Sequence, residues 1–378
     1  MKKFLSIFPI EVYVILLPSI IFFIMIGIKY FNCYLYQTIQ CINHSSAQDF
    51  ISAFLENNII SVILIFVFIY LLFSIILIIY KKDNHQNKTS FNIRSFLFIF
   101  GILYISAVAM AFEIKTIFIS ADPIHTAQVS EFLMHTDKVL FGSYLPFSFY
   151  HIIHSNILSQ IFYNSYIYLF PIILVIIFIS LFSNKEIYRK FLIAYFLAFL
   201  ISLPIWIKFP AISPDSMYLK NILNTKISVE IQNVINITQI SPRMQKNISA
   251  IGNHWIDPAG GSLAISTFPS MHAAWGIISV VSIIELWPPV AIIAIPWVVA
   301  ELIGTMYTLE HYGVDVLFGI IIGFFALWIT KRLLKFEKRY FVDSYHLFLI
   351  FDHLKQLYKS INNKLGNQIE KITKISHK

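Results

Sequence analysis

The chain has 378 residues, of which 57% are hydrophobic, 16% are aromatic and only 13% are charged. Soluble domains carry about 25% charged residues, so this composition argues against a soluble globular protein and predicts a membrane protein with many spans. The net charge of +8 is concentrated in segments predicted below to be cytoplasmic. It therefore indicates orientation and contact with anionic lipids, and we expect no nucleic-acid partner.

Apolar runs long enough to cross a bilayer as helices recur from end to end. We predict about eight spans, at 10–29, 59–80, 95–113, 162–182, 190–207, 272–287, 289–308 and 314–334. The expected fold class is therefore all-α, a polytopic bundle of membrane helices. The first run contains Glu11 and lacks a small-residue cleavage site, so we interpret it as a retained span and not as a signal peptide.

The basic residues alternate along the chain as the positive-inside rule requires of cytoplasmic segments. Most lie at the N-terminus, in the linker 81–94, around 185–190 and from 331 onward. Both termini should therefore be cytoplasmic. The segments expected on the periplasmic or lumenal side are 31–58, 114–161, 209–271 and 308–313.

Two short polar patches interrupt the apolar sequence, and each places a histidine at the end of a predicted span. They are residues 266–272, which end at His272, and residues 305–315, which contain His311. Ionisable groups near lipid need partners, water or a function. The sixth and seventh spans meet at Pro288-Pro289 and each cover roughly 23–27 Å, so both histidines should lie at the same outer level. We expect their rings within about ten ångströms of each other.

The spacing of the polar residues predicts phosphoryl transfer. A carboxylate at Asp315, four residues after His311 on the same predicted helix, can hold that imidazole in one tautomer and make it an oriented nucleophile. His272 can then protonate the departing alkoxide and activate the acceptor. Ser270 and free backbone N–H groups at the start of the sixth span can hold phosphate oxygens. The simplest mechanism is a phosphohistidine without metal or other cofactor.

Other interpretations of these residues stay open. The His-x-x-x-Asp spacing also suits metal ligation, with His254 and Asp257 nearby in sequence. Ser270 can be a plain helix cap, and Asp315 can be a first-turn residue favoured by the helix dipole. Gly319 and Gly323 form a small-residue pair that indicates helix packing in the last span.

The tetrad Pro269-Ser270-Met271-His272 followed by His311-x-x-x-Asp315 resembles the second and third signatures of the type 2 phosphatidic acid phosphatase superfamily. More narrowly, residues 305–307 ahead of 311–315 look like the inositol phosphorylceramide synthase branch, and 137–142 and 209–214 are similar to segments of that branch. The resemblance covers roughly residues 93–335. It implies a six-helix core, an attacking histidine at His311, an orienting Asp315, an acid at His272, and lipid phosphate or headgroup chemistry.

Several positions depart from the superfamily pattern. The first signature is missing, and Thr305 stands where an arginine is expected, as in the synthase branch. Glu310 stands where that branch usually has another histidine. Lys208 is therefore the best-placed cation to neutralise the phosphate, with Arg243 second, and Tyr307 is a further predicted substrate contact.

The predicted organisation has three parts: two accessory spans with an outer loop (1–92), a six-span catalytic core (93–335) and a basic amphipathic tail (336–378). Cys33 and Cys41 share the first outer loop, as a disulfide or as two free thiols. The expected partners are membrane lipids, a phospholipid donor and a lipid or alcohol acceptor. We expect headgroup transfer at the outer face, with two alternatives: a lipid-phosphate or polyprenyl-diphosphate phosphatase, and a non-catalytic transporter.

Overall fold

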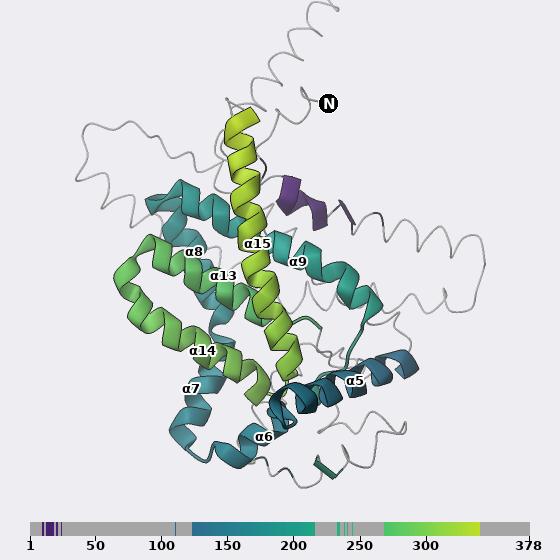
Figure 1. The fold of residues 1–378 in the computed structure, drawn as a ribbon. Helices are drawn as coiled ribbons and strands as arrows, with labels where there is room; N and C mark the ends of the chain where they lie inside the picture. Colours follow the sequence, from purple (N-terminus) through teal and green to yellow (C-terminus); the bar gives the residue numbers. More distant parts are fainter. Residues whose placement is uncertain are drawn as a thin grey trace, which may run out of the picture. The chain divides into compact units, whose positions relative to one another are not determined.

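The computed structural model describes two continuous segments, residues 123–215 and 268–340. It also describes residues 10, 13–18, 20, 21, 24, 110, 233, 234, 238, 240 and 244. These residues are mostly helical (Figure 1), in agreement with the predicted fold class. Cys33, Cys41, the predicted span 59–80, nearly all of 95–113 and the tail beyond Tyr340 lie outside the described residues. The chain divides into two compact units, 1–22 with 98–378 and 23–97, and the helices below belong to the first unit.

The continuous segments hold eight α-helices and one short 3-10 helix. Their bounds are α5 Pro123–Phe141, α6 Leu145–Ile152, α7 Asn156–Ile167, α8 Leu169–Ser183, α9 Lys185–Lys208, α13 Met271–Leu286, η2 Pro288–Val290, α14 Ala291–Tyr307 and α15 Gly313–Tyr340. Helices α5 and α6 lie in the predicted outer stretch 114–161, where the sequence pattern gave no sign of them.

Three described helices are long and apolar enough to cross a membrane: Glu186–Lys208, Pro288–Tyr307 and Gly313–Arg339. Helices α7 and α8 pass the same test only as a pair bent by 51°. The predicted span 162–182 is therefore not one straight helix, because the backbone of Tyr168 leaves the helical region with ψ near 0°. Helix α13 is shorter, with 16 residues, and the count of eight spans stays a prediction.

Helix α13 packs against α15, α9 and α14, and α14 packs against α7 (Figure 1). Two glycines of α15 permit the closest approach to α13. A Cβ atom at Gly319 would lie 2.2 Å from the carbonyl oxygen of Ser270, and one at Gly323 would lie 2.8 Å from that of Ala274. The prediction that this glycine pair serves helix packing is confirmed. The contact brings the first turns of α13 and α15 together.

Candidate active site

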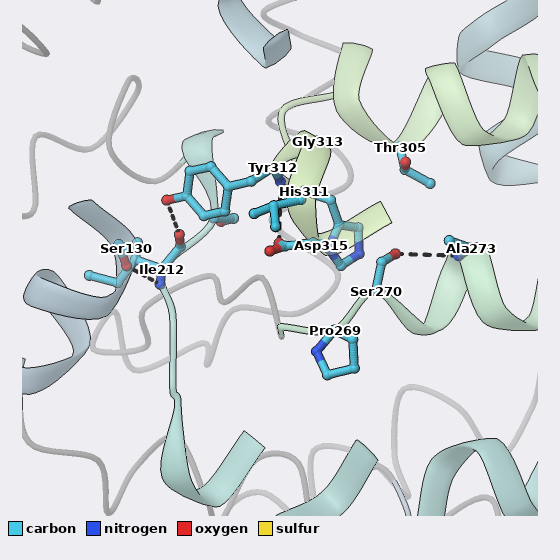
Figure 2. Close-up of polar contacts among 12 residues, drawn as sticks. Ser130, Ile212, Pro269, Ser270, Ala273, Thr305, His311, Tyr312, Gly313 and Asp315 are labelled. Carbon is cyan, nitrogen blue, oxygen red and sulfur yellow. Dashed lines mark hydrogen bonds and ion pairs between the residues drawn. The ribbon is translucent and has the colours of Figure 1, made fainter. Parts of the chain in front are cut away.

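Helix α13 begins immediately before its histidine. Ser270 is the N-cap, with extended backbone, and its Oγ accepts a hydrogen bond of 3.3 Å from Ala273 N (Figure 2). The first intrahelical bond runs from Ala274 N to Ser270 O, so the amides of Met271 and His272 precede it. Ser270 is thus a helix cap, and His272 lies in the first turn with two amides that point out of the helix end.

A tight turn between α14 and α15 carries the second histidine. The N–H groups of Glu310 and His311 both donate to the carbonyl oxygen of Thr305, each at 3.2 Å. Leu309 adopts a left-handed backbone with φ of 60°, and its carbonyl accepts from Asp215 N at 2.8 Å. The left-handed backbone is strained for a residue other than glycine. The hydrogen bonds to Thr305 O and from Asp215 N hold Leu309 in this conformation. His311 therefore lies in a turn before the helix, not on one helix with Asp315 as the spacing argument assumed.

The Asp315 carboxylate nevertheless faces the ring of His311. The distance from His311 Nδ1 to Asp315 Oδ2 is 3.4 Å, and the same oxygen accepts from Tyr312 N at 3.2 Å. Asp315 is fully buried and His311 is 5% exposed. Burial lowers the pKa of His311 from 6.5 to about 3. A neutral imidazole with its Nδ1–H toward the carboxylate leaves the Nε2 lone pair available for attack.

The two histidine rings lie side by side, with centroids 5.8 Å apart and planes at 58°. This distance is well inside the ten ångströms that the sequence argument required. Ser270 N donates to the carbonyl oxygen of Asp315 at 3.0 Å, which links the beginning of α13 to the first turn of α15. The structure thus brings Ser270, His272, His311 and Asp315 into one cluster, the histidine site.

Two aromatic side chains enclose His272 and were not found by sequence reasoning. Tyr166 stacks on its ring with centroids 4.5 Å apart, and Phe170 meets it edge-on at 5.5 Å. They come from α7 and α8, on either side of the bend. Tyr166 is 4% exposed, so the stack shields one face of His272 from water. Aromatic residues are common throughout these apolar runs, so nothing in the pattern marked these two.

A buried carboxylate from α5 caps the helix that follows the turn carrying His311. The two oxygens of Asp137 accept hydrogen bonds from Gly313 N at 2.8 Å and Val314 N at 2.7 Å. Burial is the largest effect on the pKa of Asp137 and raises it to about 7. The two amide hydrogen bonds lower this pKa, and the nearby charge of Asp315 raises it. Sequence reasoning noted Asp137 only as part of a resembling segment and missed this contact.

A chain of hydrogen bonds links the turn that carries His311 to α5 through the segment after α9 (Figure 2). Tyr312 Oη donates to the carbonyl oxygen of Ile212 at 2.6 Å, and Ile212 N donates to Ser130 Oγ at 2.7 Å. Ser130 Oγ in turn donates to Thr126 O at 2.7 Å. His311 thus sits between neighbours that are each fixed by buried bonds, which limits how far its ring can move.

Lys208 is the last residue of α9, and among the described contacts none joins its side chain to His272 or His311. Its side chain is exposed, with Nζ 5.6 Å from the ring centroid of Phe209, and its carbonyl oxygen bonds with His125 Nε2 at 3.1 Å. Two residues earlier, Trp206 Nε1 donates to the carbonyl of Pro269 at 3.2 Å. The end of α9 is therefore joined to the turn that leads into α13.

Tyr307 serves packing in this structure. Its ring stacks on Tyr150 at 4.8 Å and its hydroxyl lies 2.7 Å from Ser159 Oγ, so the side chain points toward α6 and α7. Its predicted substrate contact stays a prediction. Arg243, His254 and Asp257 lie outside the described residues. Within the part of the chain that is described, no group of three or more His, Cys, Asp and Glu side chains is arranged to hold a metal ion.

Residues 131–329, more than half of the chain, match the family model of the PAP2 superfamily. The chain belongs to the PAP2 superfamily. Members of this superfamily are phosphatases and phosphotransferases, so membership supports an enzyme of the lipid phosphatase or phosphotransferase kind. Together with the apolar helices, it is consistent with an integral membrane protein. Searches of curated proteins and of solved structures find no match.

Proposed function

We propose that this PAP2 superfamily protein is a lipid phosphotransferase that works through a phosphohistidine on His311. The observation that carries the proposal is the pair of histidine rings 5.8 Å apart, of which the buried His311 faces Asp315 through Nδ1 at 3.4 Å. This arrangement supplies a neutral nucleophile, a carboxylate that orients it, and a second imidazole for proton transfer.

In the first step, His311 Nε2 attacks the phosphorus of a lipid phosphoester. A P–N bond forms as the P–O bond to the leaving alcohol breaks, and protonated His272 gives its proton to the departing oxygen. The anionic phosphate beside His272 favours the protonated ring before the step. Asp315 stabilises the positive charge that develops on His311.

In the second step, neutral His272 removes the proton from an acceptor hydroxyl. The acceptor oxygen attacks phosphorus, the P–N bond breaks, and His311 returns to its neutral form with His272 again protonated. The two steps are the same exchange in opposite directions, so one pair of imidazoles serves both. No net proton is lost when an alcohol replaces an alcohol.

The start of α13 can hold the phosphate oxygens. The amides of Met271 and His272 precede the first intrahelical bond, and the Ser270 hydroxyl keeps its proton to donate because its oxygen accepts from Ala273 N. Lys208 is proposed as the cation at the rim, supported by the bond that joins the end of α9 to Pro269. Lys208→Ala should therefore raise the KM for the lipid, and full activity at subsaturating lipid would contradict this role.

We favour transfer of a phospholipid headgroup to a lipid or alcohol acceptor, as in the inositol phosphorylceramide synthase branch. Two features support this choice: Thr305 stands in place of the usual arginine, and His311 and Asp315 are buried, with His311 only 5% exposed. A site that excludes water disfavours hydrolysis of the intermediate. The active site is proposed to face the periplasm or lumen, because the basic residues cluster at the opposite helix ends.

The test uses the full chain in vesicles that contain a phospholipid labelled at its phosphate, with and without an acceptor alcohol. The wild type should move the label to a new phospholipid and, after rapid quenching, carry label that is stable in base and lost in acid. His311→Ala should abolish both signals. His151→Ala, which changes an exposed histidine on α6, is the matched control and should keep them.

Two outcomes would contradict the proposal in different ways. If the acceptor is present but only free phosphate forms, the protein is a lipid-phosphate phosphatase that uses the same residues. If His311→Ala retains transfer at the wild-type rate, the phosphohistidine mechanism itself is wrong.

A further inference from the structure

A basic groove lies at the end of the bundle opposite the two histidines. It has a volume of about 510 Å³ and is formed where α9 begins and where α13 and α15 end. The charged residues that line it are Lys190, Glu186, Glu285, Lys331, Lys335 and Lys338. Helix α13 runs 16 residues from the histidine site to this groove, which is about 24 Å at 1.5 Å per residue. The groove and the histidine site are therefore separated by nearly the thickness of the hydrocarbon core.

Two of the four lysines are already paired with glutamates. Lys190 Nζ bonds to Glu285, and Lys338 Nζ lies 3.0 Å from Glu186 Oε1. Lys331 and Lys335 are exposed and make no ion pair or hydrogen bond with a described residue. They are four residues apart on α15, so both project from the same face of the helix. The groove thus keeps two positive charges that its own carboxylates do not balance.

Exposed apolar side chains lead along α15 to these lysines. Ile321, Phe324, Phe325 and Trp328 are between 47% and 53% exposed, and Lys331 follows the last of them by less than one turn. Exposed apolar residues on a membrane helix face acyl chains, and tryptophan is enriched at the membrane interface. The change from exposed aromatics to exposed lysines therefore marks the level of lipid headgroups.

We propose that the groove binds the headgroup of an anionic phospholipid, with its phosphate between Lys331 and Lys335. Basic pockets between membrane helices suit anionic headgroups, and the apolar side chains below offer a surface for the acyl chains. A free phosphate ion would use the same charges, but it would gain nothing from the aromatic stretch. This lipid site is independent of the catalytic proposal, because it lies about 24 Å along α13 from His272.

The test measures binding of phosphatidylglycerol to the full chain in detergent by native mass spectrometry, with phosphatidylcholine of the same acyl chains as the reference. Removing one lysine near the headgroup should weaken binding about fivefold, so Lys331→Gln with Lys335→Gln should weaken it roughly 25-fold. The charge-conserving pair Lys331→Arg and Lys335→Arg should keep wild-type binding. Arg332→Gln removes one charge from the same helix outside the groove lining and should weaken binding much less than Lys335→Gln.

Three results would overturn the proposal. They are equal phosphatidylglycerol binding by the wild type and the double glutamine variant, binding of phosphatidylcholine as tight as that of phosphatidylglycerol, and displacement of the lipid by millimolar inorganic phosphate. The last result would assign the groove to a soluble anion. Thermal unfolding of each variant shows whether it is folded. If the glutamine pair is unfolded, the comparison of phosphatidylglycerol with phosphatidylcholine on the wild type and the single variant Lys335→Gln keep the test decisive.

Discussion

The two ends of the α13–α15 pair hold their polar groups in opposite ways. At the histidine end, the carboxylates of Asp137 and Asp315 accept from backbone amides, and both are fully buried. At the lysine end, side chains pair with side chains, and the pair of Lys338 and Glu186 is 63% and 70% exposed. The histidine end is therefore held by hydrogen bonds to the backbone, and the lysine end mostly by ion pairs between flexible side chains.

This difference matches what each end is proposed to do. A nucleophile must be held within a fraction of an ångström, and backbone amides provide that precision because the helices fix them. A headgroup that varies in size is better met by lysines, whose charge sits on a long flexible stem. Variants at the histidine end should therefore change the rate, and variants at the lysine end should change stability or lipid binding.

The largest effect should come from Asp315→Asn. The amide keeps the shape of the side chain but no longer fixes the Nδ1–H tautomer or stabilises the charged ring of His311, so kcat should fall by about 10²–10⁴ with little change in KM. Initial rates measured against lipid concentration in vesicles test this. Glu186→Gln, which removes an exposed carboxylate at the lysine end, is the control, and an equal loss of kcat in both variants would refute the contrast.

The next effect concerns the one buried ion pair described at the lysine end. Arg189 Nη2 lies 2.5 Å from Glu337 Oε2, and Glu337 is 2% exposed. Arg189→Met should lower the free energy of unfolding by about 3–5 kcal/mol, because it leaves a buried carboxylate without its cation. The double variant with Glu337→Met should recover most of that loss. Lys338→Gln, in the exposed pair, should cost at most about 1 kcal/mol.

Denaturant unfolding of the purified chain in detergent measures these changes. The kcat per folded molecule should stay at the wild-type value in all three variants, since none of them changes a contact of the histidine site. A stability loss of the same size in Arg189→Met and Lys338→Gln would show that burial does not separate the two pairs.

A smaller effect should follow from Gly319→Ala, which tests how the two ends are joined. The added methyl would lie 2.2 Å from Ser270 O, so α13 and α15 must separate, at a cost of about 1–3 kcal/mol. The shift also moves His272 away from His311, and kcat should fall along with stability. Ile321→Phe adds more volume on the exposed face of α15 and should change neither. Denaturant unfolding and initial rates of both variants measure these effects, and unchanged stability and kcat in Gly319→Ala would contradict the prediction.

The parts of this site that the sequence predicted depend on local pattern. The Ser270 cap, the break at Pro288-Pro289 and the glycine pair on α15 each follow from a short stretch of residues, and helix length then placed the two histidines at one level. The turn that holds His311 was not predictable in the same way. Its left-handed residue is Leu309 and not a glycine, so only the bonds from other segments reveal it.

The contacts that the sequence did not predict join residues far apart in the chain. Asp137 lies 176 positions before Gly313, and Tyr166 lies 106 positions before His272. An acid in α5 or a tyrosine in α7 looks the same in the sequence whether it faces the site or another helix. The bend at Tyr168 lies three residues before Pro171, which has no N–H for a helical bond, so the sequence did carry a local sign of it. The two aromatic neighbours of His272 lie on either side of this bend.

The smallest effect, and the most specific to the histidine end, should be a change in pH dependence caused by Asp137→Asn. The folded protein raises the pKa of Asp137 from 3.8 to about 7, so its contribution to stability is fully present below 3.8 and is lost as the pH rises through 7. The asparagine variant should lose about 1–2 kcal/mol as a weaker cap and should lack this downward slope between pH 4 and 8. Denaturant unfolding at several pH values measures this slope. The control is Glu131→Gln, which changes a partly exposed carboxyl group on the same helix and should keep the wild-type slope. If the free energies of unfolding of the wild type and Asp137→Asn change with pH in parallel, Asp137 stays ionised across this pH range. The two backbone amides then stabilise its charge enough to offset the effect of burial.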